Sequence, residues 1–391
     1  MSQQLINHSP DLKRLRDEGY EIEVRGGYLL IHHVPYVNGN KKIAMGTLVS
    51  NLTISGLSIG PPNTHVIHFI GEHPCNVDGS IIAAIQHSSQ PQDFGLGMMI
   101  NHSFSNKPPA GYANQYEKVK RYVEIISAQA QAVDDSLTAR TFARVHEAES
   151  DSVFRYVDTN SSRANINAIN AKFQNCRVAI VGCGGTGSYI LDLVAKTPVN
   201  SIELYDGDKF QQHNAFRSPG APAIDVLEQG EMKSDYFASL YSNMHKGIIS
   251  HPYYLDVNNL AELDEVDFTF VSLDNNPARK VIITHLIDKG KRFIDVGLGI
   301  SVVGDKLIGG VRVTSSGTDN NDHIWDRIPF VENSDQEYST NIQIADLNAL
   351  NASLAVIRWK KMMGFYQDLE KEKHQNYEIN VSKIFNEDCE A

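Results

Sequence analysis

Four glycines follow an apolar run and precede a helix-like stretch in the segment VAIVGCGGTGSYI. Glycine lets the backbone turn tightly and bring its N–H groups close to phosphate oxygens, and a helix N-terminus adds positive potential there. The turn therefore predicts a nucleotide or dinucleotide site. Its members are Gly182, Gly184, Gly185, Thr186, Gly187 and Ser188. The spacing also fits G-x-G-x-x-G, so NAD or FAD stays an alternative, as does a turn that serves only strand–helix packing.

A second group of polar residues follows the next apolar run, in LYDGDKFQQHNAFRS. Asp206 ends that predicted strand, where a carboxylate binds a ribose hydroxyl in Rossmann-like folds. A dehydrogenase needs nothing more here, but Asp208, Asn214 and Arg217 come directly afterwards. Charged and amide groups at this place suit a triphosphate, whose charge Arg217 would neutralise.

These motifs must be positioned by a sheet whose strands alternate with helices. The run CRVAIVG is continuously apolar, as in a parallel strand buried on both faces. SIELYDGD, VDFTFVSLDN and RFIDVGLG are predicted as further strands. The pattern predicts an α/β domain over residues 150–391, with a doubly wound, mostly parallel, Rossmann-like sheet.

A long helix is predicted in NIQIADLNALNASLAVIRWKKMMGFY. Its apolar residues recur at helical spacing, and they are Ile344, Leu347, Leu350, Leu354 and Ile357. Such a stripe packs either into the core or against a second subunit.

The first part of the chain is predicted as a smaller α+β domain over residues 1–140. YLLIHHVPYV and THVIHFIG are strand-like, FSNKPPAGYANQY is a loop, and a helix is expected from Tyr116 to Val133. The polar segment AVDDSLTARTFARVHEAESD is the candidate linker. The boundary is expected between residues 135 and 160.

Composition narrows the choice of function. The net charge of -12 argues against a nucleic-acid partner. No apolar run reaches the roughly 20 residues that span a bilayer, and the N-terminus lacks the apolar core of a signal peptide. Four scattered cysteines and the lack of a CxxC pair argue against a disulfide framework and a cysteine-rich zinc site, and they predict a cytoplasmic protein.

Taken together with two later elements, the motifs resemble the ThiF/MoeB/ubiquitin-activating-enzyme superfamily, and in particular its bacterial ThiF-type members with an extra N-terminal domain. The family signature is a GxGGxGS loop, then D-x-D-x-V-x-x-x-N-x-x-R, then a lysine, then a D-N pair. The loop and the second element match with their spacing intact, although Phe210 and Ala215 stand where Val and Leu are usual. Lys233 matches the lysine after a slightly longer loop, and Asp274 with Asn275 matches the D-N pair, followed by Arg279.

The resemblance implies a role for each matched residue. Asp206 would bind the ribose of ATP, and Asn214, Arg217 and Lys233 would hold the triphosphate. Asp274 would bind Mg²⁺, a hard cation that prefers carboxylate oxygen. Members of the family are homodimers in which an arginine from a segment before the glycine loop reaches across the dimer.

The segment FRYVDTNSSRANI resembles the one that supplies this arginine. Arg163 is the first choice and Arg155 the alternative, while a surface arginine in a linker is an equally simple interpretation of either.

The activity implied is ATP-dependent adenylation of the C-terminal carboxylate of a ubiquitin-like or sulfur-carrier protein, in a bacterial ubiquitin-like conjugation pathway with a conjugating-enzyme partner. The alternatives are an NAD(P)- or FAD-dependent oxidoreductase and an inactive scaffold of the same fold.

The cysteines bear on whether a thioester follows adenylation. Cys183 and Cys176 are predicted to be buried and inert. Cys389 lies in the acidic tail NEDCEA, where carboxylates weaken a thiol nucleophile. The chain is therefore expected to adenylate and to pass the acyl group on.

The segment GEHPCNVDGSII loosely resembles the HPN segment of ubiquitin-conjugating enzymes, but Cys75 interrupts the motif. A turn in a binding domain is the favoured interpretation, and the domain resembles a poorly characterised module found before bacterial ThiF-type domains. His65, His68 and His73 gather here, as structural histidines or as metal ligands.

Overall fold

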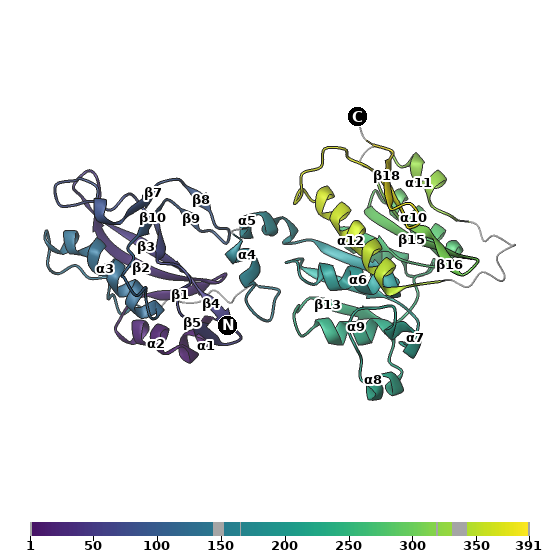
Figure 1. The fold of residues 1–391 in the computed structure, drawn as a ribbon, viewed down its shortest axis with the longest axis horizontal. Coiled ribbons are helices and arrows are strands. Elements are labelled where there is room, and N and C mark those ends of the chain that lie inside the picture. The colour runs from purple at the N-terminus through teal and green to yellow at the C-terminus, as the bar shows by residue number, and fades with distance from the viewer. Residues whose placement is uncertain (1, 144–151, 165, 318–319, 331–341, 390–391) are drawn as a thin grey trace. The chain divides into compact units, whose positions relative to one another are not determined.

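The computed structural model describes residues 2–143, 152–164, 166–317, 320–330 and 342–389 of the chain (Figure 1). The chain divides into two compact units. Unit 1 consists of Met1–Ser152 and Tyr156–Ala171, and unit 2 of Val153–Arg155 and Lys172–Ala391. Part of the predicted linker, residues 144–151, lies outside the described residues. None of the described helices is long and apolar enough to cross a membrane.

Unit 1 is built on an antiparallel sheet with the strand order β1-β2-β3-β6-β10-β7. Its elements, in chain order, are α1 (Ser2–His8), α2 (Pro10–Asp17), β1 (Ile22–Arg25), β2 (Tyr28–Val37), β3 (Ile43–Asn51), β4 (Thr53–Ser55), β5 (Ser58–Gly60), β6 (Val66–Ile70), η1 (Ala83–Ile85), β7 (Gln86–Ser88), β8 (Gln92–Asp93), β9 (Met99–Ile100), β10 (His102–Ser105), α3 (Gln115–Gln131), α4 (Thr159–Arg163) and α5 (Asn167–Asn170). A short 3-10 helix, η2 (Ala171–Phe173), follows at the start of unit 2.

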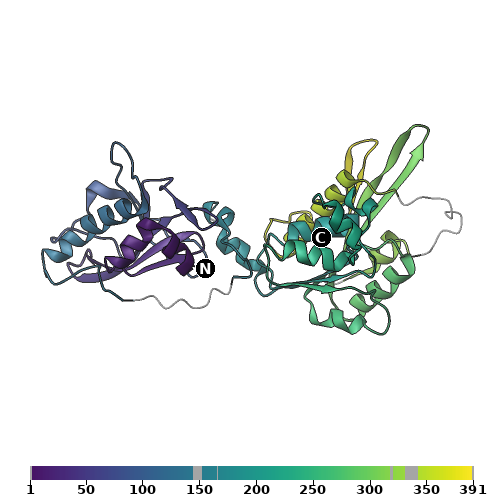
Figure 2. The ribbon, with the colours of Figure 1, turned by 90° about the horizontal axis from the view of Figure 1, so that it is seen from below.

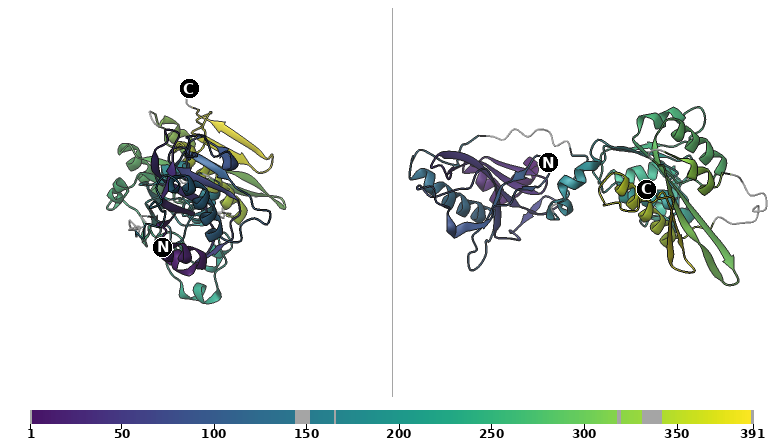
Figure 3. Two further views of the ribbon diagram at one scale, coloured as in Figure 1. Left: turned by 90° about the vertical axis from the view of Figure 1, so that its left-hand side faces the viewer. Right: turned by 90° about the horizontal axis from the view of Figure 1, so that it is seen from above.

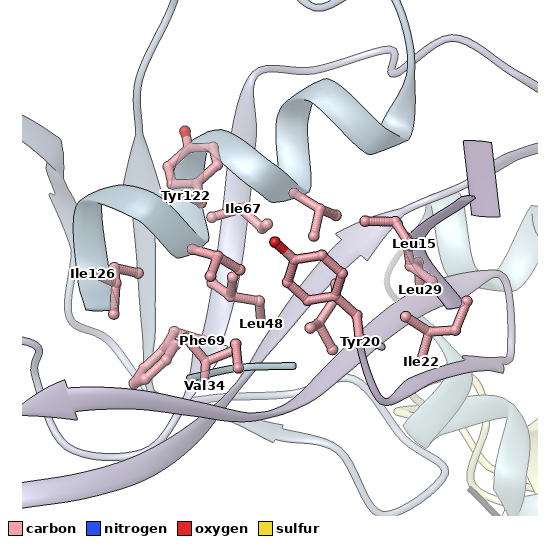
Figure 4. Close-up of a cluster of buried hydrophobic side chains, with 14 of the residues drawn as sticks. Leu15, Tyr20, Ile22, Leu29, Val34, Leu48, Ile67, Phe69, Tyr122 and Ile126 are labelled. Atoms are coloured by element: carbon pink, nitrogen blue, oxygen red, sulfur yellow. The ribbon is translucent and has the colours of Figure 1, made fainter. Parts of the chain in front are cut away.

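Helix α3 runs along one face of this sheet (Figure 2) and begins at the side-chain cap of Asn114, whose Oδ1 accepts from the N–H of Glu117 at 2.9 Å. Its apolar side, including Tyr122 and Ile126, packs with residues of β2, β3 and β6 (Figure 4). The predicted strand YLLIHHVPYV coincides with β2, and almost all of its residues are buried. Unit 1 therefore has a core of its own and is the α+β module expected before the nucleotide domain.

Unit 2 contains a sheet with the strand order β13-β12-β11-β14-β15-β16-β17-β18. Its strands are β11 (Arg177–Val181), β12 (Ser201–Tyr205), β13 (Ile248–His251), β14 (Phe268–Val271), β15 (Arg292–Val303), β16 (Lys306–Ser315), β17 (His374–Glu378) and β18 (Lys383–Glu387). Its helices are α6 (Gly185–Val194), α7 (Gln212–Ala215), α8 (Ile224–Gln229), α9 (Lys233–Tyr241), η3 (Leu260–Glu265), α10 (Asn276–Asp288), α11 (Asp322–Arg327) and α12 (Ala345–Met362). The five strands from β13 to β15 pair in parallel, and the later ones in antiparallel fashion.

Helices cover both faces of this sheet. Along β11, Val178 and Ile180 pack with α6, α9 and α12, whereas Ala179 and Val181 pack with α10 and α11. A strand buried on both faces needs apolar residues at every position, which explains the continuous run that predicted it. The doubly wound, mostly parallel α/β fold predicted from the sequence is confirmed.

The strand order places a topological switch point between β11 and β14. The chain moves from β11 outward to β12 and β13, and then returns to add β14 on the other side of β11. In open α/β sheets, ligands bind outside the carboxyl ends of the strands at such a point. The glycine turn follows β11 and the D-N pair follows β14, so the fold brings these two motifs together.

Helix α12 packs against α6 through small side chains, and Figure 1 shows both helices on one face of the sheet. Its buried side includes Asn348, Ala352 and Ala355, which allow close approach. The apolar stripe seen in the sequence coincides with this side only in part. Leu347 is buried and Leu354 packs against the core, but Leu350 is half-buried and Ile357 is 44% exposed. The helix was predicted, but not all of the residues that anchor it.

Strand β15 extends beyond its predicted end and forms a long hairpin with β16 (Figure 3). The outer part of the hairpin exposes apolar residues, among them Val302 and Leu307. The inner part lies beside the carboxyl end of β14 because β14 and β15 pair in register from Phe268 with Arg292.

Candidate nucleotide-binding site

A pocket of about 1050 Å³ lies at the switch point of unit 2. It is lined by the turns after β11, β12 and β14 and by the inner part of the β15–β16 hairpin. Most of the residues predicted from the sequence line it, and they are Gly182, Gly184, Gly185, Thr186, Asp206, Asp208, Arg217, Lys233, Asp274 and Asn275. Gly187, Ser188 and Asn214 are not among the lining residues.

The glycines of the turn have different physical tasks. Gly182 has a φ of +93°, and a Cβ there would lie 2.3 Å from the carbonyl oxygen of Ser272. A Cβ on Gly187 would lie 1.8 Å from the carbonyl oxygen of Gly182. A Cβ on Gly184 would meet no protein atom within 4 Å. Gly182 and Gly187 therefore permit the packing, while Gly184 keeps open the pocket wall where helix α6 begins.

Thr186 and Ser188 use their hydroxyl groups within the protein. Thr186 Oγ1 donates to Asn348 Oδ1 at 2.9 Å, and Ser188 Oγ donates to the carbonyl oxygen of Gly185 at 2.8 Å. Both residues are buried. Their side chains fix the start of α6, and the backbone N–H groups of that first turn are the donors that remain for a ligand.

Asp206 is held at the end of β12 by two backbone donors. Its Oδ2 accepts from the N–H of Cys183 at 2.7 Å, and its Oδ1 accepts from the N–H of Asp208 at 2.9 Å. Burial raises the pKa of this carboxyl, and the charge of nearby Lys233 opposes that rise. The first bond ties the carboxylate directly to the glycine turn.

Lys233 is anchored by carboxylates at the floor of the pocket. Its Nζ lies 2.6 Å from Asp208 Oδ2 and 3.9 Å from Asp206 Oδ1. Tyr254, which the sequence analysis missed, donates its hydroxyl to Asp208. Partial burial works to raise the pKa of Asp208, but the Lys233 and Tyr254 hydrogen bonds outweigh it and lower the pKa overall. The hydrogen bond to Asp208 raises the pKa of Tyr254 to about 12.

Asn214 and Arg217 each carry a buried donor that has no partner within the described part of the chain. Asn214 Oδ1 accepts from the N–H of Gln211 at 2.8 Å, but its Nδ2 is buried and unpaired. The same holds for Nε of Arg217, whose side chain lines the pocket. Buried donors normally have partners. These two donors are the groups at the turn after β12 that remain for a ligand with acceptor oxygens.

The turn after β14 carries Asp274 and Asn275. Asp274 is exposed and lines the pocket. Asn275 also lines it, but its Oδ1 accepts from the N–H of Ala278 at 2.9 Å and caps helix α10. Arg279 donates to the carbonyl oxygen of Leu273 and to Asn276, and these hydrogen bonds stabilise the turn.

The two candidate arginines before the glycine loop are placed differently. Arg155 belongs to unit 2, where its Nε donates to the carbonyl oxygen of Ser242 at 2.5 Å. Arg163 ends α4 in unit 1 and is exposed. Neither is among the residues that line the pocket.

The thiols differ in exposure. Cys75, Cys176 and Cys183 are buried, whereas Cys389 is exposed. Burial raises the pKa of Cys75, raises that of Cys176 to about 11, and raises that of Cys183 well above its usual value. A buried thiol that stays protonated is a poor nucleophile.

The histidines of unit 1 pack against aromatic rings. The His68 ring lies 4.8 Å from that of Phe94, and burial lowers the pKa of His68 to about 4. The His73 ring lies 4.8 Å from that of His102. Within the described ranges, no group of three or more His, Cys, Asp or Glu residues is arranged to hold a metal ion.

Tyr254, Arg312 and Asn348 are among the pocket residues that were not found from the sequence. A signal existed for Arg312, because the alternation in GGVRVTS places a charged residue on the face opposite two buried valines. Asn348 is a polar residue within a predicted amphipathic helix, next to the apolar stripe rather than on it. Tyr254 lies in a segment whose sequence shows neither strand alternation nor helical spacing.

Comparisons with known proteins give two family matches and several similar folds. The ThiF family model matches residues 163–302, and a model described as Domain of unknown function (DUF6791) matches residues 10–159. The crystal structure of E. coli MccB with succinimide is 19% identical, with a TM-score of 0.43, and the match covers 57% of this chain and 66% of that chain. PaaA is 17% identical, with a TM-score of 0.48, and the match covers 74% and 93%.

E. coli MccB with ATP is 20% identical, with a TM-score of 0.43, and the match covers 57% and 66%. This chain therefore spans just under two thirds of the first of these structures. A comparison with curated proteins gave no match.

Proposed function

Because residues 163–302 form a ThiF-family domain, we propose that this protein is an ATP-dependent adenylyltransferase that activates the C-terminal carboxylate of a ubiquitin-like or sulfur-carrier protein. The observation that carries the proposal is that Arg217, Lys233 and Asp274 line one pocket together with the glycine turn. A nicotinamide cofactor would not require this set of charges. A triphosphate with a divalent cation would.

The residues present fit such a ligand. Gly184 leaves room beside the first turn of α6, and two buried donors, Asn214 Nδ2 and Arg217 Nε, lack partners in the described part of the chain. Asp206 would bind the ribose, and Arg217 and Lys233 the phosphate oxygens. Asp274 would hold Mg²⁺, which is commonly bound through one or two carboxylates plus substrate phosphates. The metal would supply charge neutralisation on the phosphates.

The proposed reaction needs no protein base. A carboxylate is already ionised at neutral pH. Its oxygen forms a bond to the α-phosphorus of ATP while the bond from that phosphorus to the pyrophosphate oxygen breaks. The electron pair leaves with pyrophosphate, an acyl-adenylate forms, and no proton is transferred. Positioning and charge neutralisation by Arg217 and Lys233 would carry the rate.

Two further assignments belong to this proposal. The protein would act as a homodimer, with Arg163 of each chain reaching the pocket of the other. The acyl group would pass from the adenylate to a conjugating-enzyme partner, with AMP as the leaving group, since three of the cysteines are buried. Unit 1, which the DUF6791 model covers, would be the module that binds a partner.

The first test compares ligands by thermal shift. ATP with Mg²⁺ should raise the melting temperature of the wild type, and NAD should not. Stabilisation by NAD alone would favour the oxidoreductase instead. The second test is ATP–pyrophosphate exchange with a ubiquitin-like protein that ends in glycine, and the same protein with its C-terminus amidated is the control.

The variant Asp274→Asn is expected to lose at least 100-fold in exchange while keeping the wild-type melting temperature, because it removes a metal ligand from an exposed turn. Normal exchange by this variant would refute the metal assignment. No exchange with any ubiquitin-like protein, despite binding of ATP, would favour a scaffold.

A further inference from the structure

Two arginines share one buried carboxylate at the hairpin end of the pocket. Asp295 is fully buried, its Oδ1 lies 3.1 Å from Arg279 Nε, and its Oδ2 accepts from Arg312 Nη2 at 2.5 Å. The three side chains together carry one excess positive charge. Arg279 is committed to the turn of Asp274 through its bonds to Leu273 and Asn276.

The Arg312 side chain reaches from β16 across β15 toward the end of β14. Arg312 pairs with Gly297 of β15, and a Cβ on Gly297 would lie 2.7 Å from Arg312 Nη2. The guanidinium group therefore lies over β15, about 5 Å, or one strand spacing, from the strand that ends before Asp274. A side chain at position 297 would displace this group from where it lies.

Hydrogen bonds hold the Arg312 guanidinium in place, but they do not engage all of its N–H donors. Nη1 of Arg312 donates to Thr314 Oγ1 at 2.8 Å, and that hydroxyl lies 3.0 Å from His374 Nδ1. Burial lowers the pKa of His374 to about 4. A guanidinium has five N–H donors, and these bonds use two. Arg312 lines the pocket with 15% of its side chain exposed.

The position of Arg312 separates it from the nucleotide. The strands run in the order β12-β11-β14-β15-β16, so Asp206 and Arg312 stand on strands about 20 Å apart, at about 5 Å per strand. With the ribose at Asp206 and the metal at Asp274, Arg312 lies on the side of the metal away from the ribose. That is the side from which a second substrate must approach.

We propose that Arg312 binds the carboxylate of the acyl substrate and holds it beside the α-phosphate of ATP. The inference rests on the proposed function, and it assigns the place of the second substrate. A planar, charged fork matches a carboxylate through two parallel hydrogen bonds. It also offsets the repulsion between that carboxylate and the phosphates. Asp295 and Thr314 are positioning residues for the fork.

The test uses N-acetyl-tetraglycine, whose only charge is its carboxylate, and its C-terminal amide as a matched control. Binding of both to the full chain is measured by NMR in the presence of Mg²⁺ and the non-reacting analogue AMPCPP. The wild type should bind the acid at least about tenfold more tightly than the amide. Arg312→Gln should lose this preference and keep the affinity for AMPCPP. Lys306→Gln, at the exposed hairpin tip, should keep both.

The outcomes separate the two proposals. An unchanged preference in Arg312→Gln, or no preference in a wild type that binds AMPCPP, overturns this inference alone. A wild type that does not bind AMPCPP overturns the proposed function and this inference with it. If Arg312→Gln does not fold, Arg312→Lys decides. It keeps the charge and loses the fork, so a full preference for the acid in that variant also overturns the inference.

Discussion

At the scale of single residues, buried charged groups lie in two kinds of environment, with or without a neighbour of opposite charge. In unit 2, the buried carboxylates of Asp206 and Asp295 lie against lysine or arginine. In unit 1, Lys118 is fully buried, and the described residues include no carboxylate within ion-pair distance of its Nζ. That group donates to Ser50 Oγ at 2.9 Å. Burial lowers the pKa of Lys118 to about 7.

This burial predicts a pH-dependent cost in stability. The unfolded lysine has a pKa near 10.4, so between about pH 7 and pH 10 the unfolded state binds more protons and stability rises with pH. Below pH 7 the buried charge of Lys118 lowers the free energy of unfolding by its full amount. Lys118→Met should therefore be more stable than the wild type at pH 6, and this advantage should shrink by about 1–3 kcal/mol at pH 9.

Urea unfolding followed by circular dichroism measures this difference. Both tryptophans, Trp325 and Trp359, lie in unit 2, so their fluorescence gives an internal control whose midpoint should not respond to the substitution. Lys120→Met, an exposed position on the same helix, should show no change with pH. An advantage for Lys118→Met that is the same at pH 6 and pH 9 would contradict the burial argument.

At the scale of elements, the β11–α6 turn combines packing and binding in a few residues. A glycine is required at 182 and 187 because a Cβ would strike the backbone. At 184 the backbone has a φ of -71°, which any residue adopts, and the space beside it is open. A glycine at this position serves as the N-cap of α6, and it leaves room for the proposed ligand.

The two glycines therefore form a matched pair of tests. Gly184→Ala should cost less than about 1 kcal/mol in stability, from the weaker helix cap, but should weaken ATP–Mg²⁺ binding at least tenfold, since its methyl group occupies the ligand's space. Gly187→Ala should cost about 3 kcal/mol or more, because the backbone must move. Calorimetry of unfolding and of ATP binding measures both. Wild-type ATP affinity in Gly184→Ala would mean that phosphates do not approach this turn.

At the scale of the whole molecule, the proposed homodimer makes Arg163 a residue of the partner's site. Ile357 of α12 is 44% exposed and would be available to such an assembly. In the trans arrangement Arg163 serves the site of the other chain, whereas in a cis arrangement it serves its own. Only the trans arrangement allows two inactive variants to complement each other.

Arg163→Ala and Asp274→Asn should each be inactive alone. After subunit exchange at equal amounts, half of the dimers are mixed and each has one intact site, so about a quarter of wild-type exchange activity should return. A mixture that stays inactive, although exchange of labelled subunits is seen, would place the arginine in cis or rule it out. Wild-type activity of Arg163→Ala alone would point to Arg155.

Several features could be predicted from the sequence because they depend on local spacing. The continuous apolar run of β11, the glycines after it and the D-x-D element predicted the doubly wound sheet and the family of residues 163–302, and both are confirmed. Strand β2 was predicted from its apolar and β-branched residues, and helix α3 from the helix-like stretch between Tyr116 and Val133. The identity of the activated substrate and the roles of the site residues stay predictions.

Other features were decided only by the tertiary structure, because they depend on residues far apart in the chain. Asn275 caps α10 rather than serving only a ligand, and the buried side of α12 is set by close contact with α6 rather than by its apolar stripe. Arg312 reaches the pocket because β16 pairs with β15 and Gly297 leaves it room. Spacing along a sequence fixes what a strand or turn can do, whereas strand order determines which side chains from separate elements share one pocket.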